Sequence, residues 1–143
     1  MKALICHCKE YSSEITGLSD RPADIVPEAV NQRSFHANEA VVALITVERG
    51  DDVDRFAPRL AEEIRRMCDD IGRDTVVLLP FAHLSARLAD SSTSVLMIDR
   101  VATELSDLSP VRLHFGSDKR LLLDIPGHAG NVRFREFSDS SDC

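Results

Sequence analysis

Two apolar runs in the middle of the chain predict the central strands of a β-sheet. Residues 40–47 read Ala-Val-Val-Ala-Leu-Ile-Thr-Val and residues 75–79 read Thr-Val-Val-Leu-Leu, a pattern typical of strands that are buried on both faces. Between these runs, over 53–71, apolar residues recur every three or four positions, and Gly72 follows. This spacing predicts an amphipathic helix with a glycine C-cap. We expect the two strands to be parallel and joined by a right-handed crossover.

The segment after the second run contains a candidate site. Pro80 ends the strand because proline has no N–H to donate to a neighbouring strand. The apolar residues that follow, up to Ala89, recur at helical spacing and predict a short amphipathic helix. The first N–H groups of such a helix lack internal partners and would face a ligand at the strand end. The predicted floor of a pocket is therefore formed by Pro80, Phe81, Ala82 and His83.

The N-terminal part of the chain has a weaker pattern. Residues 2–8 read as a first strand, and the polar stretch 9–38 contains two prolines. A structureless connection of ~30 residues is unusual in a compact domain. We therefore expect a short strand near 11–16 and a helical turn near 27–31.

A second long helix and a final strand are expected in the C-terminal half. Hydroxyl residues at 91–94 provide an N-cap for a helix that ends near 107–109, before a proline. Residues 132–137 read as the last strand. Residues 138–143 form a polar, acidic tail that we expect to be loose.

A β-hairpin is predicted between the second long helix and the last strand. Residues 111–115 and 120–125 read as its strands, and 116–118 as a three-residue turn that contains a glycine. Lys119 would lie at the base of this hairpin.

These elements predict an α/β protein with a mixed sheet, covered chiefly on one side by two long helices and one short helix. A chain of 143 residues buries roughly two-thirds of the surface that its unfolded form exposes. We therefore expect a single domain over residues 1–137.

The charge distribution limits the possible partners. A net charge of −7 argues against broad binding along a nucleic-acid backbone, because that binding depends on Lys and Arg, but it permits docking of a nucleic-acid end. From residue 111 to 137 there are five basic and three acidic residues, so we expect any phosphate contact there. No apolar run approaches the ~20 residues of a membrane span, and the N-terminus reads as a strand, so we expect a cytoplasmic protein.

No motif for a metal, a cofactor or a standard nucleophile is visible. The cysteines Cys6, Cys8, Cys68 and Cys143 form no Cys-x-x-Cys pair, and we expect Cys6 and Cys8 to be small buried hydrophobic residues. The chain lacks a phosphate-binding glycine loop, a dinucleotide fingerprint, a His-Glu-x-x-His motif and a nucleophile elbow. We therefore expect no metal and no cofactor.

Three polar residues are candidates for chemistry. His83 follows the proline that ends a strand, a position that favours a pocket role, and His7 closes the first strand. Lys119 follows Phe115-Gly116 in the basic third of the chain, where it could bind an oxyanion, orient a water or contact a phosphate. The alternative for Lys119 is a solvated turn lysine, which composition alone favours.

Four stretches occur in a distinctive order: the opening strand that ends in His7; Ile45-Thr46-Val47-Glu48; Leu79-Pro80-Phe81-Ala82-His83-Leu84-Ser85; and Phe115-Gly116-x-x-Lys119 followed by Gly127-His128. From Met1 to about His128, the chain resembles the N-terminal editing domain of archaeal threonyl-tRNA synthetases, a relative of the D-aminoacyl-tRNA deacylases. The third stretch is the most specific, and its spacing to the fourth strengthens the resemblance.

The resemblance implies a D-aminoacyl-tRNA deacylase-like fold and the hydrolysis of L-serine wrongly esterified to the 3′ end of threonine tRNA. Lys119 would hold the substrate and the attacking water with His83 beside it, and the 2′-hydroxyl of the terminal adenosine would activate that water. The pocket would be built largely from main-chain groups. Its implied substrate-binding residues are Val47, Pro80, Phe81, Ala82, Phe115, Gly116 and His7.

The resemblance also implies partners. They are the 3′ end of tRNA(Thr) carrying serine, a second copy of the chain in a homodimer, and a threonyl-tRNA synthetase catalytic chain. No aminoacylation domain is present in these 143 residues, so the chain is either an excised domain or a free-standing editing protein.

Two features depart from the family pattern. Ser117-Asp118 stands where the family carries aromatic residues before the lysine, and Glu136 lies a few residues later than the glutamate that the family carries after Gly-His. Two alternatives therefore stay open. One is a D-aminoacyl-tRNA deacylase, and the other is a non-catalytic domain for tRNA-end binding or subunit assembly.

Overall fold

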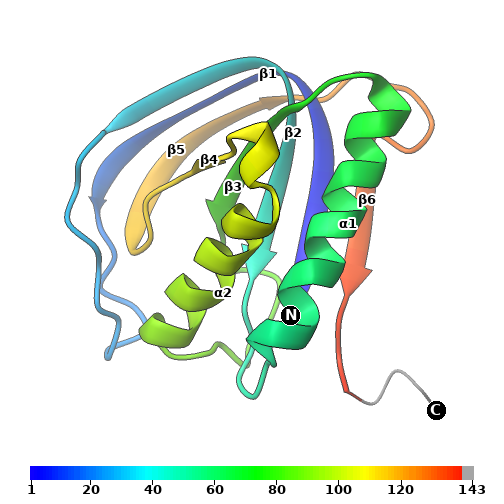
Figure 1. Cartoon of the computed structure of the whole chain (residues 1–143). Coiled ribbons are helices and arrows are strands. Elements are labelled where there is room, and N and C mark those ends of the chain that lie inside the picture. Colours follow the sequence, from blue (N-terminus) through cyan, green and yellow to red (C-terminus); the bar gives the residue numbers. More distant parts are fainter. Residues whose placement is uncertain (140–143) are drawn as a thin grey trace.

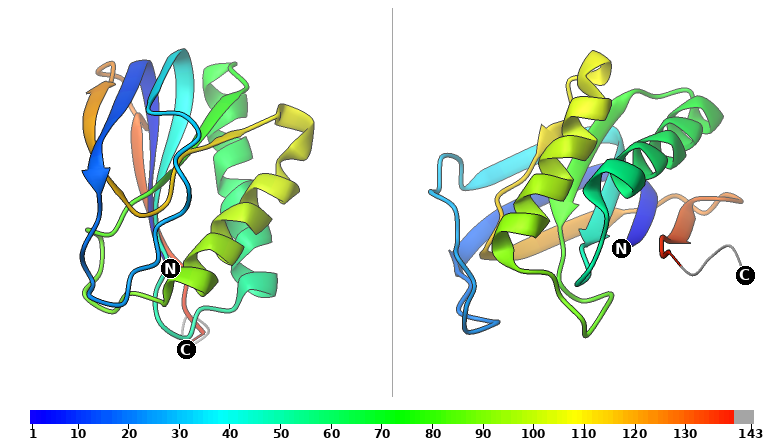
Figure 2. Two further views of the ribbon diagram at one scale, coloured as in Figure 1. Left: turned by 90° about the vertical axis from the view of Figure 1, so that its left-hand side faces the viewer. Right: turned by 60° about the horizontal axis from the view of Figure 1, so that its bottom comes forward.

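The computed structural model describes residues 1–139 and has two layers, a curved six-stranded mixed sheet and two helices packed on one of its faces (Figures 1 and 2). This confirms the predicted α/β class. The elements are β1 (Lys2–Leu18), β2 (Ser34–Thr46), α1 (Val53–Ile71), β3 (Thr75–Pro80), α2 (Ser91–Glu104), the 3₁₀ turn η1 (Ser106–Leu108), β4 (Val111–Arg112), β5 (Ser117–Asp124) and β6 (Val132–Glu136). Most of the predicted tail, residues 140–143, lies outside the described part of the chain.

Strand β1 organises the sheet because it pairs with three other strands. One edge pairs antiparallel with β2 over the range Lys2–Glu14. The other edge is shared between β6, which pairs with Lys2–Cys6, and β5, which pairs with Glu10–Leu18. The strand order is β4-β3-β2-β1-β5, with β6 also against β1. The two C-terminal strands therefore lie one after the other along a single edge of β1, and Lys119 pairs with Ile15.

The βαβ unit predicted at the centre of the chain is confirmed. Strands β2 and β3 are parallel, and α1 spans the predicted residues between them. Asp52 caps the start of α1 by accepting a hydrogen bond from the Arg55 N–H, and Gly72 ends it with a left-handed φ of 66°. No helix within residues 1–139 is long and apolar enough to cross a bilayer.

Both faces of the sheet bury apolar side chains. On the helix-covered face, Leu60 and Ile64 of α1 and Val101 of α2 pack against the strands. On the opposite face, a second cluster joins residues of β1, β2 and β3 to Leu121 and Leu123 of β5. Inner and outer residues alternate along β5, so Lys119 shares the inner face with these two leucines.

Several expectations for the N-terminal part are wrong. The strands expected at 2–8 and near 11–16 are present, but as parts of one continuous strand, β1, and β2 begins at Ser34 rather than near residue 40. No helical turn forms near 27–31. The main-chain N–H of Glu28 donates instead to the Phe115 carbonyl (3.1 Å), so this stretch bonds to a distant segment.

The predicted hairpin is also wrong. Strand β4 contains only two residues and pairs parallel with β3, whereas β5 pairs antiparallel with β1. The residues between β4 and β5 thus connect opposite ends of the strand order. Gly116 changes the chain direction there with a φ of 91°. Lys119 is therefore a residue within β5 and not at the base of a hairpin.

The last predicted helix and strand are largely confirmed. Asp90, and not a hydroxyl residue, caps α2 by accepting a hydrogen bond from the Thr93 N–H (2.8 Å). Helix α2 ends at Glu104 and is followed by η1. The predicted strand at 132–137 is β6, which ends one residue earlier.

We expect Gly116→Ala to lower the free energy of unfolding by roughly 1–3 kcal/mol, because its positive φ disfavours a side chain. An added Cβ would also lie 2.6 Å from the Cα of Pro27. Urea unfolding measures the change. The control is Gly127→Ala, where an added Cβ would have no heavy atom within 4 Å. Equal stability of the two variants would contradict this role of Gly116.

Candidate functional site

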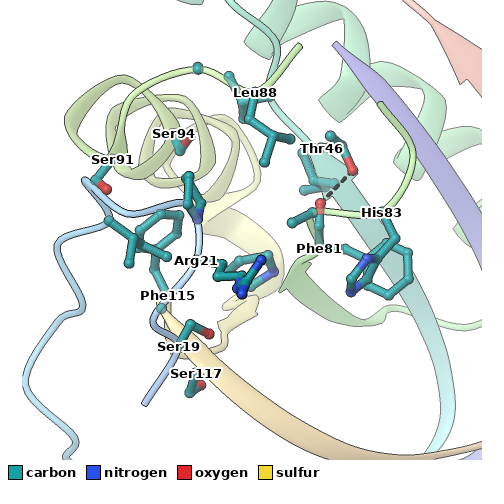
Figure 3. A pocket seen from close by; sticks show the side chains of 18 of the residues that line it. Ser19, Arg21, Thr46, Phe81, His83, Leu88, Ser91, Ser94, Phe115 and Ser117 are labelled. Atoms are coloured by element: carbon teal, nitrogen blue, oxygen red, sulfur yellow. Dashed lines mark hydrogen bonds between the residues drawn. The ribbon is translucent and has the colours of Figure 1, made fainter. Parts of the chain in front are cut away.

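A cavity of about 450 Å³ opens at the carboxyl ends of β2 and β3 (Figure 3). Its walls come from four parts of the chain: the end of β2 with the loop after β3, the start of α2, the segment 19–25, and the residues from Phe115 to Lys119. A site at the carboxyl ends of neighbouring parallel strands is the usual position for a ligand in an open α/β sheet.

The loop after β3, residues 81–90, does not form the predicted short helix. Its main chain instead bonds to the residues at the end of β2: the Phe81 N–H donates to the Ile45 carbonyl (2.9 Å), and the Ala89 N–H donates to the Val47 carbonyl (3.0 Å). These long-range bonds attach both ends of the loop to the residues at the end of β2, and the Ala89 N–H that a helix would have paired internally is used in one of them, so the loop stays open. Its backbone can therefore line the cavity.

Thr46 fixes the start of this loop. Its hydroxyl donates to the Phe81 carbonyl and accepts from the Leu84 N–H (3.3 Å). Thr46 is itself buried at the end of β2. Two bonds from one rigid strand residue therefore set the path of the main chain through Ala82 and His83.

Glu48 fixes the middle of the loop. Its buried carboxylate accepts a hydrogen bond from the Ser85 hydroxyl (2.6 Å) and from the Met1 ammonium (3.0 Å). Burial alone would raise the pKa of Glu48. The Ser85 hydroxyl and the Met1 ammonium outweigh it and hold the pKa below its usual value.

Residues 19–28 form a covering segment over the cavity. The Ser19 N–H donates to the Gly116 carbonyl (2.9 Å), and the Phe115 N–H donates to the Glu28 carboxylate (2.8 Å). Near its middle, the Val26 N–H donates to the hydroxyl of Ser91 at the start of α2 (2.9 Å). The covering segment is thus attached both to the Phe115–Gly116 wall and to the helix.

Lys119 extends from the inner face of β5 to the cavity. Its ammonium donates to the His114 carbonyl (2.8 Å). Burial lowers the pKa of Lys119 to about 8 and outweighs the effect of Asp118, which raises it. Because this pKa is below the ordinary 10.5, the charged lysine costs stability below about pH 8, and the cost declines as the pH rises towards 10.5.

The structure brings together nearly all of the predicted site residues. Val47, Phe115 and Gly116 line the same cavity as Lys119 and the predicted floor, residues 80–83. The His83 side chain is exposed and contacts the Phe81 ring edge-on, with a centroid distance of 5.0 Å. Within residues 1–139, no hydrogen-bond partner occupies the main-chain groups of Ala82 or His83. These groups are open to a ligand.

His7 is the exception, because it does not line the cavity. Its Nδ1 lies 2.8 Å from Nε2 of His128, and its Nε2 lies 3.0 Å from the Glu39 carboxylate. His7 is buried within β1 beside the turn that precedes β6. The structure thus places it in a separate polar cluster.

A serine and a histidine form a pair at the edge of the site. Nδ1 of His114 lies 2.8 Å from the Ser117 hydroxyl, and its Nε2 lies 2.9 Å from the Glu28 carbonyl. Because the carbonyl only accepts, Nε2 carries the proton, and a neutral His114 accepts from the serine through Nδ1. This pair fixes the side chain of Ser117 next to the Phe115–Gly116 bend.

No group of three or more His, Cys, Asp or Glu side chains within residues 1–139 is arranged to hold a metal ion.

Cys6 and Cys8 are buried free thiols, and burial raises their pKa values to about 11 and about 12. This confirms their expected burial. Cys143 lies outside the described residues.

Comparison with known proteins identifies the family. The model of the Archaea-specific editing domain of threonyl-tRNA synthetase matches residues 1–136. The chain belongs to this family. The resemblance seen in its sequence motifs is thereby confirmed.

Relatives of this editing domain occur both within long synthetases and as a separate subunit. It is 30% identical over 128 residues to a threonine–tRNA ligase of Nitrosopumilus maritimus, covering 90% of this chain and 20% of that protein. It is 27% identical over 129 residues to a threonine–tRNA ligase editing subunit of Saccharolobus solfataricus, covering 90% of this chain and 32% of the subunit. The chain thus spans about a fifth to a third of the length of these relatives.

The two departures from the family pattern lie in different places. Asp118 is exposed at the cavity edge, where its carboxylate accepts from the Ser19 hydroxyl (3.2 Å). Glu136 lies on β6, 3.6 Å from the Lys2 ammonium, and does not line the cavity. Of these two departures, Asp118 is therefore the one that affects the charge at the cavity of this editing domain.

Sequence reasoning missed two parts of the site. Thr46 could have been found, because it is a hydroxyl residue inside an otherwise apolar strand run. The covering segment carried no recognisable signal, because its position depends on bonds to Gly116 and Ser91, which are distant in sequence.

We expect Asp118→Asn to lower the pKa of Lys119 further below 8, because it removes a nearby negative charge. The chain contains only Lys2, Lys9 and Lys119, so an NMR titration with ¹³C-labelled lysine can follow each ammonium. Asp124→Asn, on the same strand, is the matched control. A Lys119 pKa near 10.5 in the unmodified chain would contradict the burial of its ammonium.

Proposed function

We propose that this editing domain hydrolyses the ester bond between L-serine and the 3′ end of tRNA(Thr). The observation that carries the proposal is that Lys119 and the loop after β3 line one cavity. The loop offers the open main-chain groups of Ala82 and His83, which can bind the amino-acid part. Lys119 offers a partly desolvated cation, which can stabilise the developing oxyanion and hold the attacking water.

Pocket size is the proposed basis for rejecting threonine. Serine and threonine differ by one methyl group, which is worth only ~1–3 kcal/mol in a binding pocket, so a synthetase benefits from a second, smaller site. A pocket of main-chain groups is suited to this task, because the backbone bonds from Ile45 and Val47 hold it rigid. Rigid walls exclude the extra methyl group by steric overlap rather than by adapting to it.

We further propose that the substrate assists its own hydrolysis. The 2′-hydroxyl of the terminal adenosine would accept a proton from the attacking water, while Lys119 orients the water and His83 borders the pocket. The water oxygen attacks the ester carbonyl, the bond from carbon to O3′ breaks, and the proton ends on O3′. Serine and tRNA with a free 3′-hydroxyl result.

Assembly is part of the same proposal. We propose a homodimer that receives its mischarged tRNA from a threonyl-tRNA synthetase catalytic chain in the cytoplasm. The support is the family, whose relatives include both long ligases and an editing subunit. Apolar side chains exposed on the outer strands, Val132 and Phe134 of β6, offer surface for such contacts.

We expect Lys119→Met to reduce release of labelled serine from Ser-tRNA(Thr) by about 100-fold or more, because it removes the cation but keeps a long side chain. Arg120→Met is the control, since Arg120 is the exposed neighbour on the outer face of β5. No release above buffer with micromolar unmodified protein would contradict the proposal. Release that is faster from tRNA esters of D-amino acids would favour a deacylase instead.

The same assay separates the proposed route from a covalent one. We expect Ser117→Ala to retain activity within a few-fold, because water rather than Ser117 is the attacking group in the proposed route. Loss of activity in Ser117→Ala, together with retained activity on a 2′-deoxy substrate, would instead assign the attack to the Ser117–His114 pair.

A further inference from the structure

A second cavity, of about 420 Å³, shares Lys119 with the first and is otherwise lined by different residues. Ser13 and Ile15 of β1, the stretch 28–35, and the residues 111–114 form its walls. Lys119 therefore lies at the boundary between the two cavities.

The two cavities differ in charge. The first is lined by four carboxylates and two cationic side chains, a formal charge of −2, from Asp20, Asp24, Asp90, Asp118, Arg21 and Lys119. The second is lined by one carboxylate and three cationic side chains, a formal charge of +2, from Glu28, Arg33, Arg112 and Lys119. This positive charge stands out in a chain whose net charge is −7.

Arg112 contributes little to an incoming anion, because it is already engaged by Glu28 and by the Asp99 carboxylate (2.9 Å). Arg33 differs, since its exposed guanidinium has no ion pair or hydrogen bond within residues 1–139. Among the described residues, the neutral His114 carbonyl is the one direct hydrogen-bond partner of the Lys119 ammonium. The second cavity therefore contains two cations, Arg33 and Lys119, that are available to an anion.

Neutral donors surround these cations. Asn31 and Gln32 line the cavity beside Arg33, with the Gln32 amide also donating to the Ser34 carbonyl (2.8 Å), and Ser13 lines it from β1. Phosphate oxygens accept hydrogen bonds from side chains of this kind, and arginine provides a planar set of donors that matches a phosphate. The donor set of the cavity thus fits a phosphate group.

We propose that the second cavity binds an internucleotide phosphate of the tRNA 3′ end while the aminoacyl-adenosine occupies the first. This inference rests on the proposed function. The charges of such a substrate match the two cavities, because the α-ammonium of the amino acid is positive and each internucleotide phosphate is negative. Lys119 then lies between the ester and the RNA backbone.

The experiment compares two non-hydrolysable ligands by calorimetry. One is adenosine with serine attached through an amide at the 3′ position, and the other is the trinucleotide CCA with the same seryl amide. We expect Arg33→Gln to weaken binding of the trinucleotide about three- to tenfold and to reduce its dependence on log salt by about 0.7. Binding of the adenosine ligand should not change, because it carries no phosphate.

Two other arginines serve as controls. Arg120→Gln removes an exposed cation on the outer face of β5 and should affect neither ligand. Arg21→Gln removes the cation that lines the first cavity but not the second. A trinucleotide-specific loss in this variant, rather than in Arg33→Gln, would overturn the inference by placing the phosphate in the first cavity. If Arg33→Gln and the unmodified chain bind the trinucleotide equally well, the inference is overturned while the proposed function stands. Failure of both ligands to bind the unmodified chain would overturn the proposed function with it.

Discussion

The pairing of β1 with three other strands is the constraint on which the site depends. One edge of β1 pairs with β2, and the other pairs with both β6 and β5. The first pairing places the end of β2 and the loop after β3 on one side of the cavity, and the last places Lys119 on the other. Residues that are distant in sequence, such as Val47, His83 and Lys119, thereby form a single site.

The environment of Lys119 follows from that pairing. An inner position on β5 places Lys119 on the same face as Leu121 and Leu123 and removes much of its ammonium from water. A partly desolvated cation interacts more strongly with a developing negative charge than a solvated one does. Holding this cation at neutral pH thus lowers the stability of the folded chain, but it provides the charge that the proposed chemistry needs. Such a balance is common at functional sites.

Local patterns in the sequence predicted the elements whose bonds are themselves local. Helix α1 and its glycine cap follow from apolar periodicity and Gly72, and the parallel βαβ unit follows from two buried runs around that helix. The predicted helix after Pro80 failed because Ile45, Thr46 and Val47 bind the main chain of that loop, and periodicity does not report such bonds. The predicted hairpin failed for the same reason, since β5 pairs with the distant β1.

The candidate site was more predictable than the topology. The motif resemblance pointed to residues of the loop after β3 and of the Phe115–Lys119 stretch. The structure gathers them around one cavity, although the short helix and the hairpin predicted for these segments are wrong. The inner position of Lys119 was harder to predict, because Leu121, Leu122 and Leu123 form a continuous apolar run that does not show which residues face inward. The placement of His7 away from the cavity could not have been predicted. It depends on the register between β1 and β2, in which His7 pairs with Val41 and not with the end of β2.

A crystal structure of the chain with the seryl-amide analogue of adenosine tests the central claim most directly. The account predicts that the seryl group lies against the main chain of Ala82 and His83, with the Lys119 ammonium within hydrogen-bond distance of the bound amide or of a water beside it. An analogue bound elsewhere on the surface, with the cavity between Lys119 and the loop after β3 left without it, would contradict the account.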